Sequence, residues 1–320
     1  MNRRNFCTWL GGSSIMTLVD YDGLAQGTPS PLSVPYSAGT DSPKLRAPPN
    51  ACDAHHHIYD PRFPVAPHWK SGMPQDATVA AYRLLQKRLG TTRSVVVQPS
   101  TFGVDNSCLL DALAQLGSTS RGVVVVDTSV TDAELKKMAA AGVCGIRVNF
   151  VSPQSWGATT PEMLVALAKK VNDLNWHVQV LMLGEQIAQM ESALQGLPTP
   201  VVLDHLGRIP QPDGLDHAGY AAVRRLLDNG RTWVKLSEPY EDTKVGPPRY
   251  EDTSKLAKSY IDAAPERVVW GSDWPHPTQK VKPDDALLFD LLTDWAPNEA
   301  TRRRILVSNP EALYGFPKSP

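Results

Sequence analysis

Short apolar runs alternate with longer amphipathic stretches along most of the chain. Several of the runs are apolar on both faces, which is typical of strands in a parallel sheet covered by helices. The valine-rich segments 95–97 and 123–126 are the clearest. The pattern predicts strands at 51–55, 94–98, 122–126, 145–150, 177–181, 201–204, 233–236 and 268–271.

The stretches between these runs have the length and periodicity of amphipathic helices. Thr131 with Glu134 forms a helix-start signal, and Gly142 is a suitable stop. Helices are expected at 77–89, 105–116, 132–141, 161–174, 185–194, 218–228, 254–263 and 284–295. Eight strands alternating with eight helices predict an α/β fold of the (β/α)8 TIM-barrel type. A doubly wound sheet is the alternative, but it needs fewer strands and usually a glycine-rich phosphate loop, which this sequence lacks.

The first part of the chain has a different composition. Residues 1–26 carry Arg3 and Arg4 before a moderately apolar stretch, which is the pattern of a twin-arginine export signal. A disordered basic terminus is the alternative. Residues 27–49 are rich in proline, serine and glycine and are expected to form a linker, so that the barrel occupies residues 50–320. We therefore expect a periplasmic protein, or a cytoplasmic one if the signal is absent.

Overall composition narrows the possible partners. The 320 residues are 42% hydrophobic and 20% charged, with a net charge of −1, so nothing directs the protein to nucleic acid. The sequence contains no apolar run of about 18 residues, the length that would predict a membrane span. The four cysteines form no CxxC pair and do not suggest a disulfide framework. A small molecule is the expected partner, and the sequence leaves the oligomeric state open.

Polar side chains recur where the apolar runs end. In a TIM barrel, the carboxyl ends of the strands carry the chemistry. Alternate side chains on a strand share a face, so His55 and His57 should face the reaction centre and His56 should not. His177 begins its strand and is expected to be structural. The other polar residues on or after the predicted strands are Gln98, Arg147, His205 and Asp273.

These residues fall in segments that resemble the lactonase branch of the amidohydrolase superfamily, a branch with pyrone-dicarboxylate and sugar-acid lactonases and isomerases. The likeness runs in register from about residue 51 to residue 314. The segments that carry it are 52–64, 97–100, 145–150, 203–208 and 269–277.

The resemblance implies roles for individual residues. Asp273 is expected to be the general base, and the histidines at 55, 57 and 205 are expected to polarise the carbonyl. The same four residues would hold a metal if one is bound, so the cofactor is either none or one divalent ion, zinc or manganese. No lysine ends the fourth strand, where two-metal relatives carry a bridging lysine. The expected substrate-binding residues are Arg147, Gln98, Ser100, Arg208 and His276.

The chain also departs from the pyrone-dicarboxylate pattern. Two arginines and a tyrosine of that pattern are replaced by Pro153, Glu241 and Leu181, which disfavours a dianionic substrate. We expect a hydrolase that opens a carboxylate- or hydroxyl-bearing lactone. The alternatives are a lactone isomerase, a metal-dependent decarboxylase of the same superfamily, and a non-catalytic exported binding protein.

Overall fold

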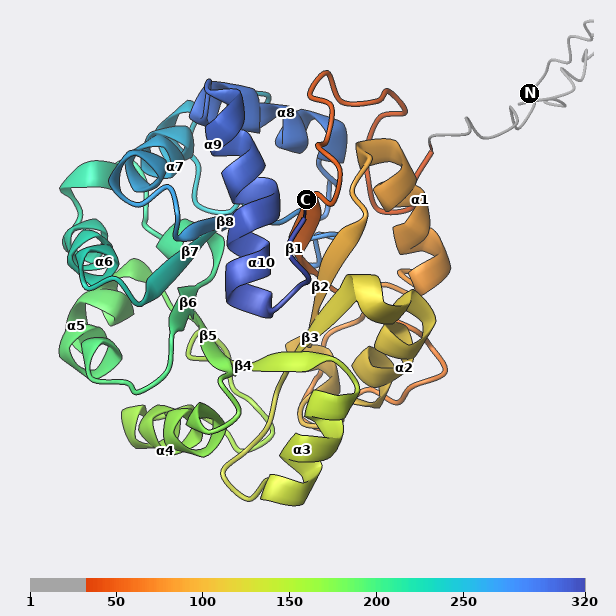
Figure 1. Ribbon diagram of the computed structural model, residues 1–320, viewed down its shortest axis with the longest axis vertical. Helices are drawn as coiled ribbons and strands as arrows, with labels where there is room; N and C mark the ends of the chain where they lie inside the picture. Colours follow the sequence, from red (N-terminus) through yellow and green to blue (C-terminus); the bar gives the residue numbers. More distant parts are fainter. Residues whose placement is uncertain (1–32, 320) are drawn as a thin grey trace, which may run out of the picture.

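The computed structural model describes residues 33–319 and shows a ring of eight strands surrounded by helices (Figure 1). Neighbouring strands are hydrogen-bonded in sequence order, and every pair is parallel. This is the predicted TIM barrel. The strands are β1 (Cys52–His56), β2 (Arg93–Val97), β3 (Ser120–Val124), β4 (Val143–Asn149), β5 (His177–Leu181), β6 (Val201–Leu203), β7 (Thr232–Leu236) and β8 (Val268–Trp270).

All eight predicted helices are present, with ends within three residues of those expected. They are α1 (Val79–Leu89), α2 (Ser107–Leu116), α3 (Asp132–Ala140), α4 (Pro161–Asn172), α5 (Gly184–Gln195), α6 (Ala218–Asp228), α7 (Glu251–Ala263) and α8 (Asp285–Trp295). The capping box of Thr131 and Glu134 begins α3. Two further helices, α9 (Glu299–Arg303) and α10 (Asn309–Tyr314), were not predicted.

The first and last strands meet through backbone hydrogen bonds. The Asp273 amide donates to the His55 carbonyl, and the His57 amide donates to the Trp274 carbonyl, both at 2.8 Å. Gly271 permits this approach, because a Cβ at that position would lie 2.5 Å from the Cβ of His55. The contact brings the carboxyl ends of β1 and β8 together and sets His55, His57 and Asp273 side by side.

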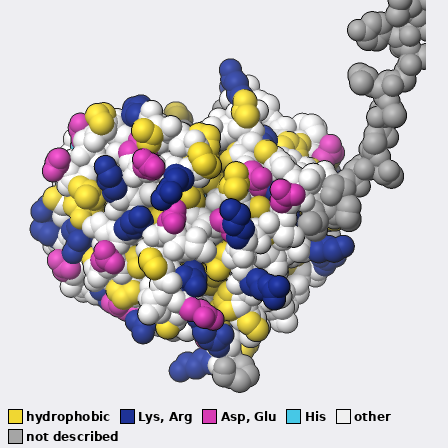
Figure 2. Space-filling view, turned by 90° about the horizontal axis from the view of Figure 1, so that it is seen from above, with side chains coloured by type: hydrophobic (Ala, Val, Ile, Leu, Met, Phe, Trp, Pro, Cys, Tyr) yellow, Lys and Arg dark blue, Asp and Glu magenta, His cyan; other side chains and the backbone are white. Residues whose placement is uncertain are grey.

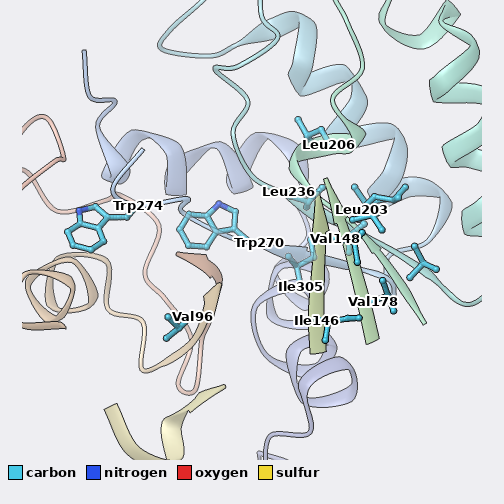
Figure 3. Packing of buried hydrophobic residues seen from close by; sticks show 14 of the residues in the cluster. Val96, Ile146, Val148, Val178, Leu203, Leu206, Leu236, Trp270, Trp274 and Ile305 are labelled. Atoms are coloured by element: carbon cyan, nitrogen blue, oxygen red, sulfur yellow. The ribbon is translucent and has the colours of Figure 1, made fainter. Parts of the chain in front are cut away.

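Apolar and polar side chains lie on opposite faces of the strands, and this separation is clearer than the sequence pattern indicated. Val96, Ile146, Val178 and Leu236 pack in the large cluster between strands and helices (Figure 3). Alternate positions face the barrel interior. On β4 and β7 those alternate positions carry buried charged side chains. These are Arg147 and Lys235.

Helix α10 lies across the amino-terminal ends of the strands (Figure 1). Its Tyr314 joins the small cluster inside the barrel, together with Phe316 and residues of β1, β2, β3 and β8. The ring of His177 lies 5.4 Å from the ring of Tyr314. His177 is therefore packed at the end of the barrel opposite the polar strand ends, as predicted.

Residues 33–49 are hydrogen-bonded to the barrel at several points. The indole nitrogen of Trp274 donates to the Pro35 carbonyl at 2.7 Å, and the Arg88 guanidinium donates to the Asp41 carbonyl at 2.9 Å. The expected linker at 27–49 is thus an arm packed on the barrel from residue 33 onward. The predicted export signal at 1–26 lies outside the described residues.

The surface mixes charges of both signs. Figure 2 shows basic and acidic side chains interspersed over one face. No helix of the described residues is long and apolar enough to cross a membrane. Cys52, Cys108 and Cys144 are free thiols.

Candidate active site

One histidine from β1, one histidine directly after it and one aspartate from the segment after β8 meet at the centre of the barrel. Asp273 Oδ1 lies 3.6 Å from His55 Nε2 and 3.5 Å from His57 Nε2. All three side chains are almost fully buried. His56 faces away and stacks on Tyr82, with ring centres 3.5 Å apart. The predicted facing of the three histidines is therefore observed.

Three successive strands are followed by a residue in the left-handed backbone region. These residues are His205 after β6, Glu238 after β7 and Asp273 after β8, with φ values of 49°, 50° and 62°. Non-glycine residues rarely adopt this conformation, and such residues often cluster at functional sites. Each of the three offers a ligand atom within 4.8 Å of the others. Glu238 thus joins the predicted residues His205 and Asp273 in the site.

The two neighbouring carboxyl groups differ in charge. Burial opposes ionisation of Asp273, but the adjacent imidazoles of His57 and His205 hold its pKa well below the usual range. Burial and the Asp273 charge raise the pKa of Glu238 well above its usual value. Of the two groups, Asp273 is therefore the one that ionises first, and Glu238 keeps its proton to higher pH.

A second buried ion pair lies beneath the histidines. Arg147 donates from Nε to Asp204 Oδ2 at 3.0 Å. Burial disfavours the Asp204 charge, yet Arg147 and His55 bring its pKa well below the usual range. This pair fixes Arg147 against the wall of the barrel.

His55 Nδ1 faces two partners of opposite kind. The Lys235 ammonium, which can only donate, lies 3.3 Å away, and Asp204 Oδ1, which only accepts, lies 3.4 Å away. If Lys235 donates, the proton of His55 sits on Nε2 and points toward Asp273. If Nδ1–H donates to Asp204, Nε2 presents a lone pair to the site. The two tautomers suit carbonyl polarisation and metal ligation, respectively.

The other two histidines are held by their Nδ1 atoms. His57 Nδ1 lies 2.8 Å from the Val97 carbonyl, which can only accept, so Nδ1 carries the proton and Nε2 faces Asp273. His205 Nδ1 lies 2.9 Å from Ser237 Oγ. Burial lowers the pKa of His205 to about 4. His205 is therefore neutral at physiological pH.

A cavity of 450 Å³ opens above these residues. Trp69 and Tyr59 supply aromatic surface, and Asn149 supplies an amide. Of the predicted site residues, those that line it are His57, His205, Asp273, Arg147, Arg208 and Ser100. His55 lies against this set, with its ring centre 4.7 Å from that of His205.

Two predicted substrate-binding residues do not line the cavity. Gln98 is fully buried, and its amide nitrogen donates to the carbonyls of Gly103 and Asp105. His276 is also fully buried and lies between Tyr240 and Asp285. Gln98 thus supports the backbone of the loop after β2, which needs hydrogen-bond partners, whereas the ring of His276 bonds to side chains.

Tyr240 connects His276 to the reaction centre. Its hydroxyl lies 2.9 Å from Asp273 Oδ2 and 2.9 Å from His276 Nδ1. The second ring nitrogen of His276 lies 3.1 Å from Asp285 Oδ2. The sequence predicts no contact of Tyr240 or Asp285 with the site residues, since neither directly follows an apolar run.

The residues fit one divalent cation. Ligand atoms of His55, His57 and Asp273 lie within 4.8 Å of one another. Within the described residues, His55 Nε2 and Asp273 Oδ1 are buried and have no hydrogen-bond partner. The bond between His57 Nδ1 and a backbone carbonyl is the arrangement that orients a metal-ligating imidazole. His205 lies beside this set as a further donor.

Comparison with known proteins places these features in a family context. Residues 52–316 match the family described as amidohydrolase. The 2-pyrone-4,6-dicarboxylate hydrolase of Comamonas testosteroni is 34% identical over 302 residues, covering 91% of this chain and 98% of that protein. The D-galactarolactone isomerase of Agrobacterium fabrum is 32% identical over 278 residues, covering 85% and 94%. A crystal structure from Agrobacterium tumefaciens superposes with a TM-score of 0.81 at 31% identity, covering 89% and 99%.

Proposed function

This chain belongs to the amidohydrolase family, and from that premise we propose that it is a lactone hydrolase, which opens a cyclic carboxylic ester with water. The observation that carries the proposal is the position of Asp273. It is a buried carboxylate with two imidazole nitrogens within 3.6 Å, beside a cavity large enough for a small ring. The relative from Comamonas testosteroni, named as a hydrolase of a pyrone, supports the same reaction class.

Asp273 serves as the general base. It takes a proton from a water molecule whose oxygen forms a bond to the lactone carbonyl carbon. The ring C–O bond then breaks, and the proton passes from Asp273 to the departing alkoxide. The product is a hydroxy acid. Because the pKa of Asp273 is held low, its basic form is present throughout the neutral range.

The histidines stabilise the oxyanion that develops on the carbonyl oxygen. Donors fixed in advance in a buried site are effective at this task. With Lys235 donating to His55 Nδ1, His55 presents an Nε2–H donor to the reacting group. His205 is held by Ser237 and lies on the other side of the site. Arg147, fixed by Asp204, orients an oxygen-rich substituent of the substrate.

A divalent cation at the same site would be held by His55, His57 and Asp273, with His205 beside them. When bound, such an ion polarises the carbonyl group and acidifies a water molecule. Arg147 and the other residues that line the cavity would bind the substrate in the same way with or without the cation.

The test is a panel of lactones with acid release followed by a pH indicator. We expect the wild-type protein to release acid and Asp273→Asn to lose about a thousandfold or more in kcat, because the general base is removed. Asp111→Asn is the matched control, since Asp111 pairs with Arg62 outside the cavity. Equal rates for wild type and Asp273→Asn on every lactone would refute the proposal.

Lactone isomerisation is the second candidate. The proximity of Glu238 to Asp273 favours it, because the raised pKa of Glu238 makes it a proton donor beside a proton acceptor, and such a pair can exchange protons with two hydroxyl groups of one substrate. The relative named D-galactarolactone isomerase supports it as well. Reaction in heavy-oxygen water separates the two reactions, since hydrolysis alone incorporates the label into the product carboxylate.

A further inference from the structure

The cations that line the cavity are both paired with carboxylates of the protein. Arg208 donates from Nε to Asp242 Oδ2 at 2.7 Å and from Nη2 to Asp242 Oδ1 at 3.2 Å. Its Nη2 also lies 3.5 Å from Glu241 Oε1. Arg147 has its Nε bonded to Asp204. The edge of Arg208 formed by Nε and Nη2, which can bind a carboxylate through two parallel hydrogen bonds, is thus already occupied.

The acidic pair, Glu241 and Asp242, is itself held in place. Glu241 Oε2 accepts hydrogen bonds from Thr278 Oγ1 at 2.8 Å and from Gln279 Nε2 at 2.9 Å. These donors come from the segment between β8 and α8, whereas the acidic pair follows β7. The pairing with Arg208 therefore spans three segments of the barrel, those after β6, β7 and β8, and is present before any substrate arrives.

The charge balance of the cavity follows from these contacts. Within residues 33–319, three carboxyl side chains line it, Glu238, Glu241 and Asp273, against two arginines. Even with Glu238 neutral, the partners Asp204 and Asp242 leave carboxylates in excess. A dianionic ligand in the cavity is repelled by this excess of negative charge. It also finds the Nε and Nη2 edge of Arg208 already paired. A hydroxyl group meets carboxylate oxygens that accept its proton.

We propose that the acidic pair withholds Arg208 from the substrate, so that the cavity accepts hydroxyl-bearing lactones with at most one carboxylate and excludes dianionic ones. This inference rests on the proposed lactone hydrolysis and adds the device that sets its specificity. Trp69 and Tyr59 contribute apolar surface against which the carbon face of a hydroxylated ring can lie. Neutralising the acidic pair frees the Nε and Nη2 edge of Arg208 and reverses the preference.

The experiment compares wild type with Glu241→Gln/Asp242→Asn. Binding is measured by calorimetry with pyridine dicarboxylate, a dianion with no bond to hydrolyse. Turnover is measured with gluconolactone and with pyrone dicarboxylate. We expect the double variant to bind the dianion at least about tenfold more tightly, because charged bidentate bonds become available. The ratio of kcat/KM for pyrone dicarboxylate to that for gluconolactone should rise by a similar factor.

Asp60→Asn with Asp111→Asn is the matched control, because it removes two carboxylates from Arg62 outside the cavity. It should leave both the binding constant and the ratio unchanged. The proposal is overturned if wild type already binds the dianion as tightly as the double variant, or if both double variants behave alike. Failure of the proposed lactone hydrolysis would give a different result. Wild type would then turn over neither lactone, while the double variant would still bind the dianion more tightly than wild type does.

Discussion

The hydroxyl of Tyr240 is predicted to hold Asp273 in its reactive orientation, and Tyr240→Phe tests this. The hydroxyl donates to Asp273 Oδ2 at 2.9 Å and lies equally close to His276 Nδ1. It therefore fixes one carboxylate oxygen and leaves Oδ1 beside His55 and His57. Phenylalanine keeps the ring and removes this constraint alone.

The protons available along this series of hydrogen bonds, from Asp273 through Tyr240 and His276 to Asp285, explain why the hydroxyl is well placed. Tyr240 has one proton, and with Asp273 as the acceptor, its oxygen must accept from His276 Nδ1–H. The other ring nitrogen of His276 lies 3.1 Å from Asp285 Oδ2, and a proton on either of these two atoms satisfies that contact. Loss of the hydroxyl leaves a buried carboxylate oxygen and a buried ring nitrogen without their partner.

The expected loss follows from the type of bond. A hydrogen bond to a charged group contributes about 1.5–3 kcal/mol, which is roughly a 10- to 150-fold change in rate if it is lost in the transition state. The reduction should appear in kcat, with KM little changed, because Tyr240 is not among the described residues that line the cavity. Steady-state kinetics on a lactone turned over by wild type measures both parameters.

Tyr260→Phe provides the control. Tyr260 is fully buried, and its hydroxyl donates to the Leu206 carbonyl at 3.3 Å, so the substitution removes a buried tyrosine hydrogen bond away from Asp273. We expect both variants to lower the melting temperature modestly and only Tyr240→Phe to lower kcat. Equal kcat values for the two variants would refute the positioning role, and a rise in KM at constant kcat would assign Tyr240 to substrate binding instead.

Three further predictions concern stability and metal binding. Asp204→Asn should lower the free energy of unfolding by about 3–5 kcal/mol, measured in urea, because it leaves Arg147 buried without its partner. Buried His177 and His205 have pKa values of about 3 and about 4, below the ordinary value of 6.5, so the unfolded state alone binds their protons as the pH falls. The unfolding free energy should therefore fall by about 3 kcal/mol between pH 6.5 and 5, and a flat profile would contradict this. Chelator-treated protein should take up one equivalent of zinc, measured by elemental analysis, and His57→Ala should abolish the uptake.

The fold was predictable because the strands of a covered parallel sheet are short and apolar. The prediction failed where a segment has no amphipathic period of its own. Helix α10 begins at Asn309, follows a short π-helical turn at Arg304–Ser308, and buries Tyr314 against the strand ends. Its apolar residues have a partner surface only after the barrel has closed, so no local pattern reveals it.

The sequence was sufficient to predict which strand ends carry the site. It was not sufficient to predict the directions in which their side chains point. Asp273, His205 and Arg147 were expected at the cavity and lie there. Gln98 and His276 stand at equally suitable places in the chain, yet their polar atoms bond to neighbouring segments. Position along a strand does not determine which hydrogen-bond partner a long side chain finds, because that partner comes from another segment.

The left-handed backbone at the strand ends accounts for the composition of the site. A non-glycine residue in this region costs roughly 1 kcal/mol or more, and His205, Glu238 and Asp273 all adopt it. Hydrogen bonds across the barrel offset part of this cost, such as that from the Asp273 amide to the His55 carbonyl. Each of three adjacent strands is followed by a residue with this positive φ, and as a result all three side chains meet at one point. Glu238 shares this backbone with two residues expected to act on substrate, so its place in the site follows from the fold as directly as theirs.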